Sequence, residues 1–254
     1  MSDPILEATN LVKRYGKTFA ANNISFQIQA GEFLGVIGPN GSGKTTLVNL
    51  ITRFIKPDRG KVYFQGRDIS NLKPHAIANM GIVRSFQMAI PLYHLPAFKN
   101  VVVALRSPRV LKQFRWGRYG DRDDIAIDIL EEVGFERDSF VPYKLASALP
   151  HGYLKRMELA RCMAMRPTIY ILDELFSGMS LSEVAATMPI IENMKERGDT
   201  IIMIEHRLKE LFQLADRVMV LNFGQNIAEG PPDTILHDES VQSAYIGSEI
   251  EEVI

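Results

Sequence analysis

One glycine-rich segment has the residues and the spacing of a phosphate-binding loop. It lies between the apolar run 33–38 and the helical pattern 47–55, and its residues are Gly38, Pro39, Asn40, Gly41, Ser42, Gly43, Lys44, Thr45 and Thr46. This is a complete G-x-x-x-x-G-K-[ST] pattern in the strand-loop-helix context that it requires. The glycines let successive backbone N–H groups and the helix N-terminus face one anion, while Lys44 reaches the β- and γ-phosphates and the Thr45 hydroxyl binds Mg²⁺. The segment therefore predicts a site for a nucleoside triphosphate.

A pair of adjacent carboxylates follows a second apolar strand pattern. The run 168–173 ends in Asp173, and Glu174 comes next. On its own, such a pair is also typical of a strand that ends in a solvated acidic turn. Beside a phosphate-binding loop, the two positions serve two roles: Asp173 holds magnesium, directly or through water, and Glu174 orients or deprotonates the attacking water. Together the two motifs predict hydrolysis of the bound nucleotide.

Short runs rich in β-branched and aromatic residues predict the strands that carry these motifs. The runs are 5–12, 24–28, 33–38, 61–65, 81–86, 168–173, 200–205 and 217–222. Several are apolar at every position, as in strands covered on both faces, and helical patterns separate them. The runs 5–12 and 24–28 alternate better, which indicates an antiparallel flank. We therefore predict an α/β fold: a P-loop NTPase core, with a mainly parallel sheet and an antiparallel flank, plus an inserted α-helical subdomain.

The strand signal fades in the middle of the chain, where the patterns 123–133 and 152–165 have helical periodicity. We predict that residues 1–87 and 168–254 form a RecA-like nucleotide-binding core, and that residues 88–167 form the inserted helical subdomain. Within the insert, residues 106–122 combine basic and aromatic side chains. A nucleic-acid patch has this composition, but so does a solvated or partner-facing loop, which we favour because the rest of the chain is neutral.

The composition limits the classes of function. The chain has 254 residues, 46% of them hydrophobic, and a net charge of −1, which offers no overall attraction to nucleic acid. Cys162 is the single cysteine, which excludes an internal disulfide and a cysteine-based zinc cluster and suits a reducing compartment. No apolar run reaches the roughly 18 residues that a transmembrane helix needs, and the first residues do not resemble a signal peptide. We expect a cytoplasmic protein that meets a membrane only through a partner.

With these motifs in place, the chain resembles the ABC ATPase family over nearly its whole length. The resemblance implies three further site residues. Tyr15, upstream of the phosphate-binding loop, would stack on the adenine of ATP. Gln87, where the core meets the insert, would contact magnesium and the attacking water and sense the membrane partner. His206, at the end of the strand pattern 200–205, would hydrogen-bond the γ-phosphate, a task that suits a side chain able to donate and accept.

The resemblance also implies contacts across a dimer of two ATPase subunits. The signature motif, which faces the nucleotide of the other subunit, corresponds here to Leu149, Pro150, His151, Gly152 and Tyr153. It departs from the usual serine, two glycines and glutamine, so a hydroxyl aimed at the γ-phosphate is lost, although Gly152 and the helix N-terminus still offer backbone donors. The D-loop also departs, because Ser180 stands where the family has aspartate or asparagine, and Leu175 replaces the usual proline.

These departures concern what the subunit presents to its partner, whereas its own nucleotide motifs are intact. We therefore hypothesise a heterodimer with a second ATPase subunit that has a better preserved signature. The resemblance further implies transmembrane permease subunits, a substrate-binding protein that acts indirectly, and a position on the cytoplasmic face of the membrane. The apolar, turn-rich segment 88–98 is expected to form part of a groove for a permease helix, or else a packed loop without a partner.

Within the family, the compact single unit, the extended insert after Gln87, the Leu-Pro-x-Gly signature and the tail 227–232 resemble the ATPases of importers for branched-chain amino acids and their relatives, including those for urea or amides. Two alternatives stay open. Pro150, His151 and Ser180 also fit a weakly hydrolysing regulatory subunit. A soluble ABC ATPase of translation or DNA repair is less favoured, because such proteins usually have two ATPase units or a long coiled coil.

Overall fold

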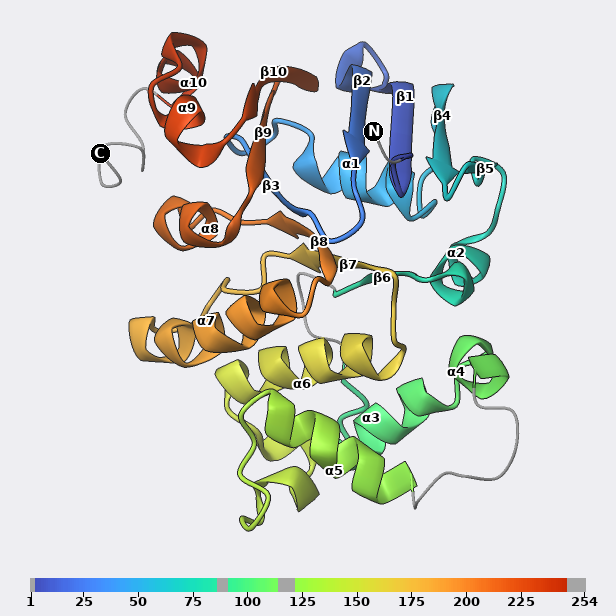
Figure 1. Cartoon of the computed structure of the whole chain (residues 1–254), viewed down its shortest axis with the longest axis vertical. Helices are drawn as coiled ribbons and strands as arrows, with labels where there is room; N and C mark the ends of the chain where they lie inside the picture. Colours follow the sequence, from blue (N-terminus) through green and yellow to red (C-terminus); the bar gives the residue numbers. More distant parts are fainter. Residues whose placement is uncertain (1–2, 86–90, 114–121, 246–254) are drawn as a thin grey trace.

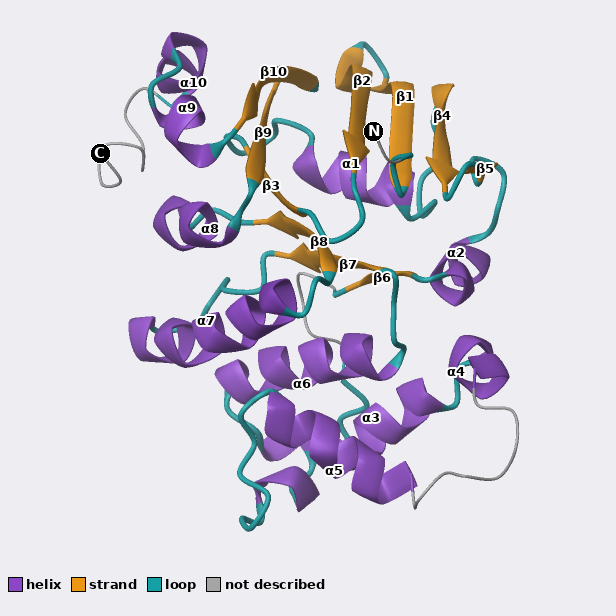
Figure 2. Ribbon diagram, viewed as in Figure 1, coloured by secondary structure: helices purple, strands orange, loops and turns teal. Residues whose placement is uncertain are grey.

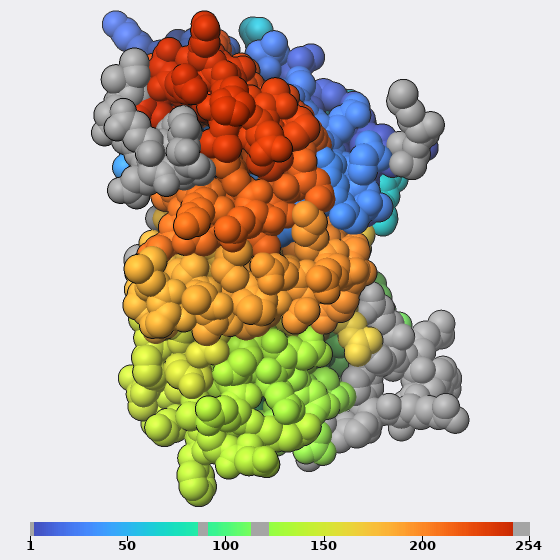
Figure 3. Space-filling model, turned by 60° about the vertical axis from the view of Figure 1, so that its left-hand side comes forward, coloured from blue at the N-terminus to red at the C-terminus, as the bar shows by residue number. Residues whose placement is uncertain are grey.

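The computed structural model describes residues 3–85, 91–113 and 122–245. Figures 1 and 2 show an antiparallel sheet at one end, a second sheet through the middle and a group of helices at the other end. In Figure 3 the same order appears as bands of colour, with the C-terminal segment in red at the top, the segment around α7 in orange and the insert in green at the bottom. The nucleotide motifs lie on the middle sheet.

The middle sheet has six strands, of which five are parallel. In spatial order they are β10 (Gln225–Gly230), β9 (Arg217–Asn222), β3 (Phe33–Ile37), β8 (Thr200–Ile204), β7 (Ile169–Asp173) and β6 (Ile82–Arg84). Only β10 runs antiparallel to its neighbour β9. Every residue of β3, β7 and β8 is buried, as expected for strands with helices on both faces. The predicted α/β fold is confirmed.

Alternate side chains of these strands supply two hydrophobic clusters, because successive residues of a strand point to opposite faces. Phe33 and Ile37 of β3 belong to the cluster that extends into the insert. Leu34 and Val36 belong to the cluster that the antiparallel sheet and α1 (Lys44–Ile51) share. The sheet is therefore held between two layers, and the loop between β3 and α1 lies at its edge.

The antiparallel sheet has the order β2 (Thr18–Ile28), β1 (Leu6–Tyr15), β4 (Arg59–Phe64) and β5 (Arg67–Asp68). Strands β1 and β2 pair antiparallel from Leu6 with Ile28 to Tyr15 with Thr18, with shifts of register between Ala8 and Arg14. Their inward residues, such as Leu11 and Ile24, pack with Leu47 of α1. The predicted antiparallel flank is confirmed, and β4 and β5 extend it.

The remaining helices cover the sheets or form the insert. Those of the core segments are α2 (Pro74–Met80), α7 (Leu181–Glu196), α8 (Leu208–Leu214), α9 (Pro232–Leu236) and α10 (Glu239–Ala244). Those of the insert are α3 (Ala97–Leu105), α4 (Pro108–Gln113), α5 (Arg122–Glu132) and α6 (His151–Ala164), with short 3₁₀ turns at Val141–Tyr143 and Ala146–Ala148. The helices predicted at 123–133 and 152–165 correspond to α5 and α6. The exact boundaries of the two parts stay a prediction.

Within the described residues, no helix combines the length and the apolar character that crossing a bilayer requires.

Candidate functional site

The phosphate-binding loop connects the buried strand β3 to the first turn of α1. Gly43 is the N-cap of α1, with φ of 108°, a backbone conformation that residues with a side chain rarely adopt. A Cβ at this position would lie 2.3 Å from the carbonyl oxygen of Ala20 in β2. The loop is therefore pressed against the antiparallel sheet at a point where only glycine fits, and the first N–H groups of α1 have no intrahelical partner.

Lys44 begins α1 and folds back over its own loop. Its Nζ donates to the carbonyl oxygens of Gly38, at 2.6 Å, and Pro39, at 3.2 Å. The side chain is buried, so a cation is fixed at the centre of the loop, where the loop backbone encloses it. Such a cation, together with free helix N–H groups, makes an anion site.

Ser42 supplies a further indication that the loop fits a polar ligand. Its Oγ is buried and has no hydrogen-bond partner among the described residues. A buried hydroxyl without a partner is rare and costs about 1–3 kcal/mol of stability, so it calls for an explanation. A phosphate oxygen held by the loop would provide the missing acceptor. Thr45 is exposed and Thr46 is half-buried on the same first turn, so neither hydroxyl is enclosed by the protein.

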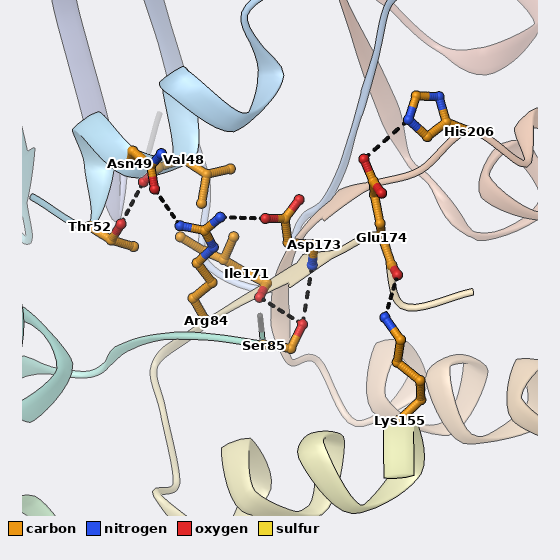
Figure 4. A network of polar contacts seen from close by, with 10 residues as sticks. All are labelled: Val48, Asn49, Thr52, Arg84, Ser85, Lys155, Ile171, Asp173, Glu174 and His206. Carbon is orange, nitrogen blue, oxygen red and sulfur yellow. Dashed lines mark hydrogen bonds and ion pairs between the residues drawn. The ribbon is translucent and has the colours of Figure 1, made fainter. Parts of the chain in front are cut away.

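Asp173 ends the buried strand β7 and is tied to α1 through Arg84 of β6. Nη2 of Arg84 lies 2.5 Å from Oδ2 of Asp173, and Nη1 donates to Oδ1 of Asn49 in α1 at 2.6 Å. The backbone N–H of Asp173 donates to the Ser85 Oγ at 3.2 Å. Figure 4 shows this chain of contacts between the helix that begins in the loop and the strand that carries the carboxylate. The arrangement fixes Asp173 relative to the phosphate-binding loop.

Glu174 points away from Asp173 toward His206, as Figure 4 shows. Its Oε1 lies 3.1 Å from His206 Nε2, within hydrogen-bond distance, and its backbone N–H donates to the Ile204 carbonyl oxygen at 2.9 Å. Glu174 has φ of 50°, in the left-handed region that a residue with a side chain adopts only where the surroundings impose it. The turn after β7 and the end of β8 thus bring the predicted carboxylate and the predicted histidine together.

Two further buried charged residues, Lys155 and Glu205, lie close to Glu174 and His206. Neither was among the site residues predicted from the sequence. Lys155 of α6 is buried, and its Nζ donates to the backbone carbonyl oxygen of Glu174 at 3.0 Å. Glu205 is also buried, and its Oε1 accepts from the Phe176 N–H at 2.7 Å. Burial raises the pKa of Glu205 to about 7, although hydrogen bonds from the backbone of Phe176 and His206 oppose the rise. Only the position of Glu205 beside His206 could have signalled its importance.

Tyr15 lies at the end of β1, next to the phosphate-binding loop. Its side chain is about half exposed, with Lys13 Nζ at 5.8 Å from the ring centroid. Tyr15 pairs with Thr18, and two residues further along β2 the Ala20 carbonyl contacts Gly43 of the loop. The ring is therefore near the loop and accessible to a ligand. Gln87 lies outside the described residues, so its predicted contacts stay a prediction.

The signature residues lie on the other side of the middle sheet from α1 (Figure 1). Pro150 is the N-cap of α6, and Gly152 in the first turn is buried. Tyr153 packs within the insert, with its ring 5.0 Å from that of Phe135 and beneath the guanidinium of Arg156. Ser180 is the N-cap of α7. Leu149 is buried and His151 is exposed.

The geometry brings together an anion-binding loop, one carboxylate held near it and a second carboxylate paired with a histidine. This set can bind a phosphate chain and orient a water molecule for attack on its terminal group.

Comparison with known proteins agrees with this chemistry. The family described as ABC transporter matches residues 21–177, and the family described as branched-chain amino acid ATP-binding cassette transporter matches residues 225–251. The high-affinity branched-chain amino acid transport ATP-binding protein BraF of Pseudomonas aeruginosa is 33% identical over 97% of this chain and 99% of its own length. The corresponding protein LivG of Escherichia coli is 32% identical over 97% of this chain and 99% of its own length.

Solved structures give the same result. The ADP conformation of an ATP-binding cassette of an ABC transporter superposes with a TM-score of 0.83 at 32% identity, over 97% of this chain and 100% of the other. A nucleotide-free cassette superposes with the same TM-score and identity. A dimeric bacterial ABC transporter cassette, at 24% identity and a TM-score of 0.78, supports the fold alone. This chain belongs to the ABC transporter family and is one of its ATPase subunits.

Proposed function

We propose that this subunit hydrolyses ATP to drive an importer for branched-chain amino acids or related small polar solutes. The observation that carries the proposal is the pairing of Glu174 with His206, 3.1 Å apart, at the edge of the sheet that also holds the loop of Lys44. The match of residues 225–251 to the branched-chain amino acid family, and the names of the relatives that match over nearly their full length, support the class of solute.

The residues divide the work of hydrolysis between them. The loop N–H groups and Lys44 bind the phosphates, and Tyr15 offers a face on which adenine stacks. His206 holds the attacking water or the γ-phosphate, while Glu174 orients that water and accepts its proton. Because Glu174 and His206 contact each other, each holds the other in position, which favours electrostatic stabilisation of the transition state.

The donor set near the phosphates also fits magnesium. Mg²⁺ takes oxygen ligands, and in nucleotide sites one or two protein groups suffice because phosphates and water fill the remaining positions. Asp173, which is 1% exposed and aligned by Arg84, and the Thr45 hydroxyl are the protein ligands that we propose, with Gln87 from outside the described residues. Bound there, the ion neutralises charge that develops on the phosphates.

We propose that hydrolysis requires two ATPase subunits that close on nucleotide. One subunit leaves part of the γ-phosphate uncovered, and Gly152 with the N-terminus of α6 supplies donors suited to the nucleotide of the other subunit. Closure with ATP and opening after hydrolysis then form a mechanical cycle. The replaced residues Pro150 and Ser180 favour a second subunit of different sequence over a homodimer.

An apolar hollow is suited to the permease. Its volume is about 450 Å³, and it is lined by Thr52, Phe54, Pro74, His75, Ile77, Ala78, Ile82, Val83, Arg84 and Met165. Phe54 is 53% exposed. Leu92, Tyr93 and Leu95 are also exposed large hydrophobic residues, and we include them in the surface proposed for the permease. Arg84 lines the hollow and also contacts Asp173. Movement of a helix docked in the hollow is therefore transmitted through Arg84 to the nucleotide site.

The substitution Glu174→Gln tests the proposed activity. It preserves the size and a hydrogen-bonding oxygen of the side chain but removes its capacity to accept a proton. We expect ATP turnover of the complex isolated from membranes to fall by at least about 100-fold, with the Kd for ATP changed less than about threefold.

Glu192→Gln, at an exposed position of α7, is the matched control and should leave turnover unchanged. Unaltered turnover in Glu174→Gln would support a weakly hydrolysing regulatory subunit instead. Absence of ATP binding by the unaltered complex would overturn the proposal altogether.

A further inference from the structure

The signature helix α6 has no cap of its own. Its N-cap is Pro150, and no side chain of the N-cap accepts from the first turn. The first N–H groups of a helix need acceptors, and a helix end without them is unstable. In this chain the acceptor comes from another helix, because the backbone N–H of Gly152 donates to the carboxylate of Glu183 in α7.

The contact between the two helices is close. A Cβ on Gly152 would lie 2.3 Å from Oε1 of Glu183, so a larger residue would displace the carboxylate from its present position. The absence of a side chain at Gly152 therefore permits this close approach. On the neighbouring turn, a Cβ on Gly178 would lie 2.9 Å from Cε1 of His151. The signature segment and the D-loop thus pack closely against each other at Gly152 and Gly178.

The same carboxylate also closes the N-terminus of α7. The Ser180 N–H and Oγ each donate to Oε2 of Glu183 at 2.9 Å, and the Glu183 N–H donates to the Ser180 Oγ at 3.3 Å. These bonds form a capping box. The hydrogen bonds from Ser180, first from its backbone and then from its side chain, lower the pKa of Glu183, and those from Gly152 add to the effect. Glu183 is consequently ionised at neutral pH.

We propose that Glu183 is a positioning residue that couples the D-loop to the signature helix and competes, through its negative charge, with the partner's nucleotide for the Gly152 N–H. The inference rests on the proposed function, which gives that N–H to the terminal phosphate of the nucleotide on the second ATPase subunit. Carboxylate and phosphate are both anions, so each weakens binding of the other to one short helix end. Engagement of the partner's ATP then requires Glu183 to release Gly152 or to be screened.

This competition deepens the asymmetry that Pro150 and Ser180 suggest. Glu183 lies in the first turn of α7, at the site that this subunit completes for its partner, and not on the loop of Lys44. The charge therefore weakens the partner's nucleotide site while leaving the chain's own loop unaffected. It also transmits movement, because displacement of the Glu183 carboxylate by phosphate disturbs the cap of α7 and with it the D-loop.

The first experiment measures the contact itself in the full chain without nucleotide. Amide hydrogen exchange at Gly152 is compared in the unaltered protein, Glu183→Ala and Glu183→Gln, with Glu192→Gln as the matched control. Loss of the acceptor in Glu183→Ala should speed exchange by at least about threefold, whereas Glu183→Gln retains an acceptor and should stay near the unaltered rate. Exchange in Glu183→Ala equal to that of the unaltered protein would overturn the coupling.

The second experiment measures how the Glu183 charge affects ATP hydrolysis by the complex isolated from membranes with its permease and second ATPase subunit. In a Lys44→Ala background, where the remaining turnover comes from the partner's nucleotide site, Glu183→Gln should lower the KM for ATP about two- to fivefold, as for removal of a partly exposed like charge, with kcat changed less than about twofold. The difference should shrink as salt is raised, because screening weakens the repulsion. A merely structural role would raise KM or lower kcat in Glu183→Gln, and would not depend on salt.

The outcomes separate the two proposals. A KM in Glu183→Gln equal to that of Glu192→Gln in the same background overturns the competition while leaving the proposed function intact. A complex that hydrolyses no ATP in its unaltered form overturns the proposed function and the competition together, and the exchange experiment then still decides whether Glu183 couples the two helices.

Discussion

At the scale of single residues, the site depends on charges that are buried together. Glu174 meets His206 on one side and, through its backbone carbonyl, Lys155 on the other. Glu205 lies behind them, with its carboxylate bound by the Phe176 N–H. A buried carboxylate that is not fully compensated favours its neutral form, which is why the pKa of Glu205 is raised to about 7. Protonation near this site is therefore linked to folding.

Glu205 predicts a pH dependence of stability. Its pKa is raised from 4.5 to about 7 in the folded protein, so between these values the folded state binds more protons than the unfolded state. Stability is then greatest below about pH 4.5 as far as this group is concerned, and it falls as pH rises through 7. The loss is on the order of 3 kcal/mol if the whole shift is realised.

Urea unfolding of the unaltered protein and of Glu205→Gln at pH 6 and pH 8 measures this term. The free energy of unfolding should fall between the two pH values in the unaltered protein and change less in Glu205→Gln. Glu192→Gln, which replaces an exposed carboxylate, should retain the full decrease. If the free energy of unfolding fell equally between pH 6 and pH 8 in Glu205→Gln and in the unaltered protein, the assignment to Glu205 would be contradicted.

At the scale of helices and strands, the site is assembled from the ends of buried strands. The loop follows β3, Asp173 ends β7, and His206 follows β8, all at one edge of the sheet because the three strands are parallel. The hollow beside Phe54 lies between α2, β6 and the end of α1. Arg84 belongs to β6 and reaches Asp173, so the element that lines the hollow also holds the proposed magnesium ligand.

The docking proposal predicts the effect of a charge in the hollow. Phe54→Glu places a carboxylate where an apolar helix is expected to bind, and the exposed position lets the chain fold normally. Recovery of the subunit with its permease should fall by about tenfold or more, while the Kd for ATP of the purified chain stays unchanged. Phe140→Glu, at an 85% exposed position in the insert, is the control, and undiminished recovery of Phe54→Glu would exclude this hollow as the docking site.

The elements differ in how far the sequence could predict them. Strands β3, β7 and β8 are uniformly apolar and were predicted closely, whereas β10 is largely polar and was missed because its partner β9, not its own pattern, makes it a strand. The loop of Lys44 and the carboxylates after β7 have local signatures. The contact of Arg84 with Asp173 joins residues 89 positions apart, and that of Glu183 with Gly152 depends on helix packing, so neither has a local pattern.

At the scale of the whole molecule, the chain forms its own nucleotide site but, under the proposed function, needs a second ATPase subunit to cover the γ-phosphate. Its own loop, carboxylates and histidine lie together, whereas α6 lies on the other side of the middle sheet from α1, the helix that begins in that loop (Figure 1). Two such subunits bury their nucleotides between them under the proposed function. The asymmetry between an intact site and an altered signature then distinguishes the two nucleotide sites of the assembled transporter.

The heterodimer proposal predicts the behaviour of the isolated chain. Purified alone, it should bind ATP but show little cooperative turnover, because its own signature completes a second copy poorly. In the complex from membranes, Lys44→Ala in this chain should remove most of the turnover, since the partner's signature completes this site, and the equivalent lysine change in the partner should remove less. Vigorous cooperative hydrolysis by the isolated chain would contradict the heterodimer.

The bonds that Lys44 makes to the carbonyl oxygens of Gly38 and Pro39 have a consequence for affinity. The two bonds tie the loop backbone to the ammonium group, so the cation and the loop hold one shape together, which limits the conformational entropy lost on binding. A phosphate oxygen that binds Lys44 competes with these two peptide acceptors. The affinity for nucleotide then depends on the preference of one cation for phosphate over peptide, which is smaller than the attraction between an isolated ammonium and a phosphate.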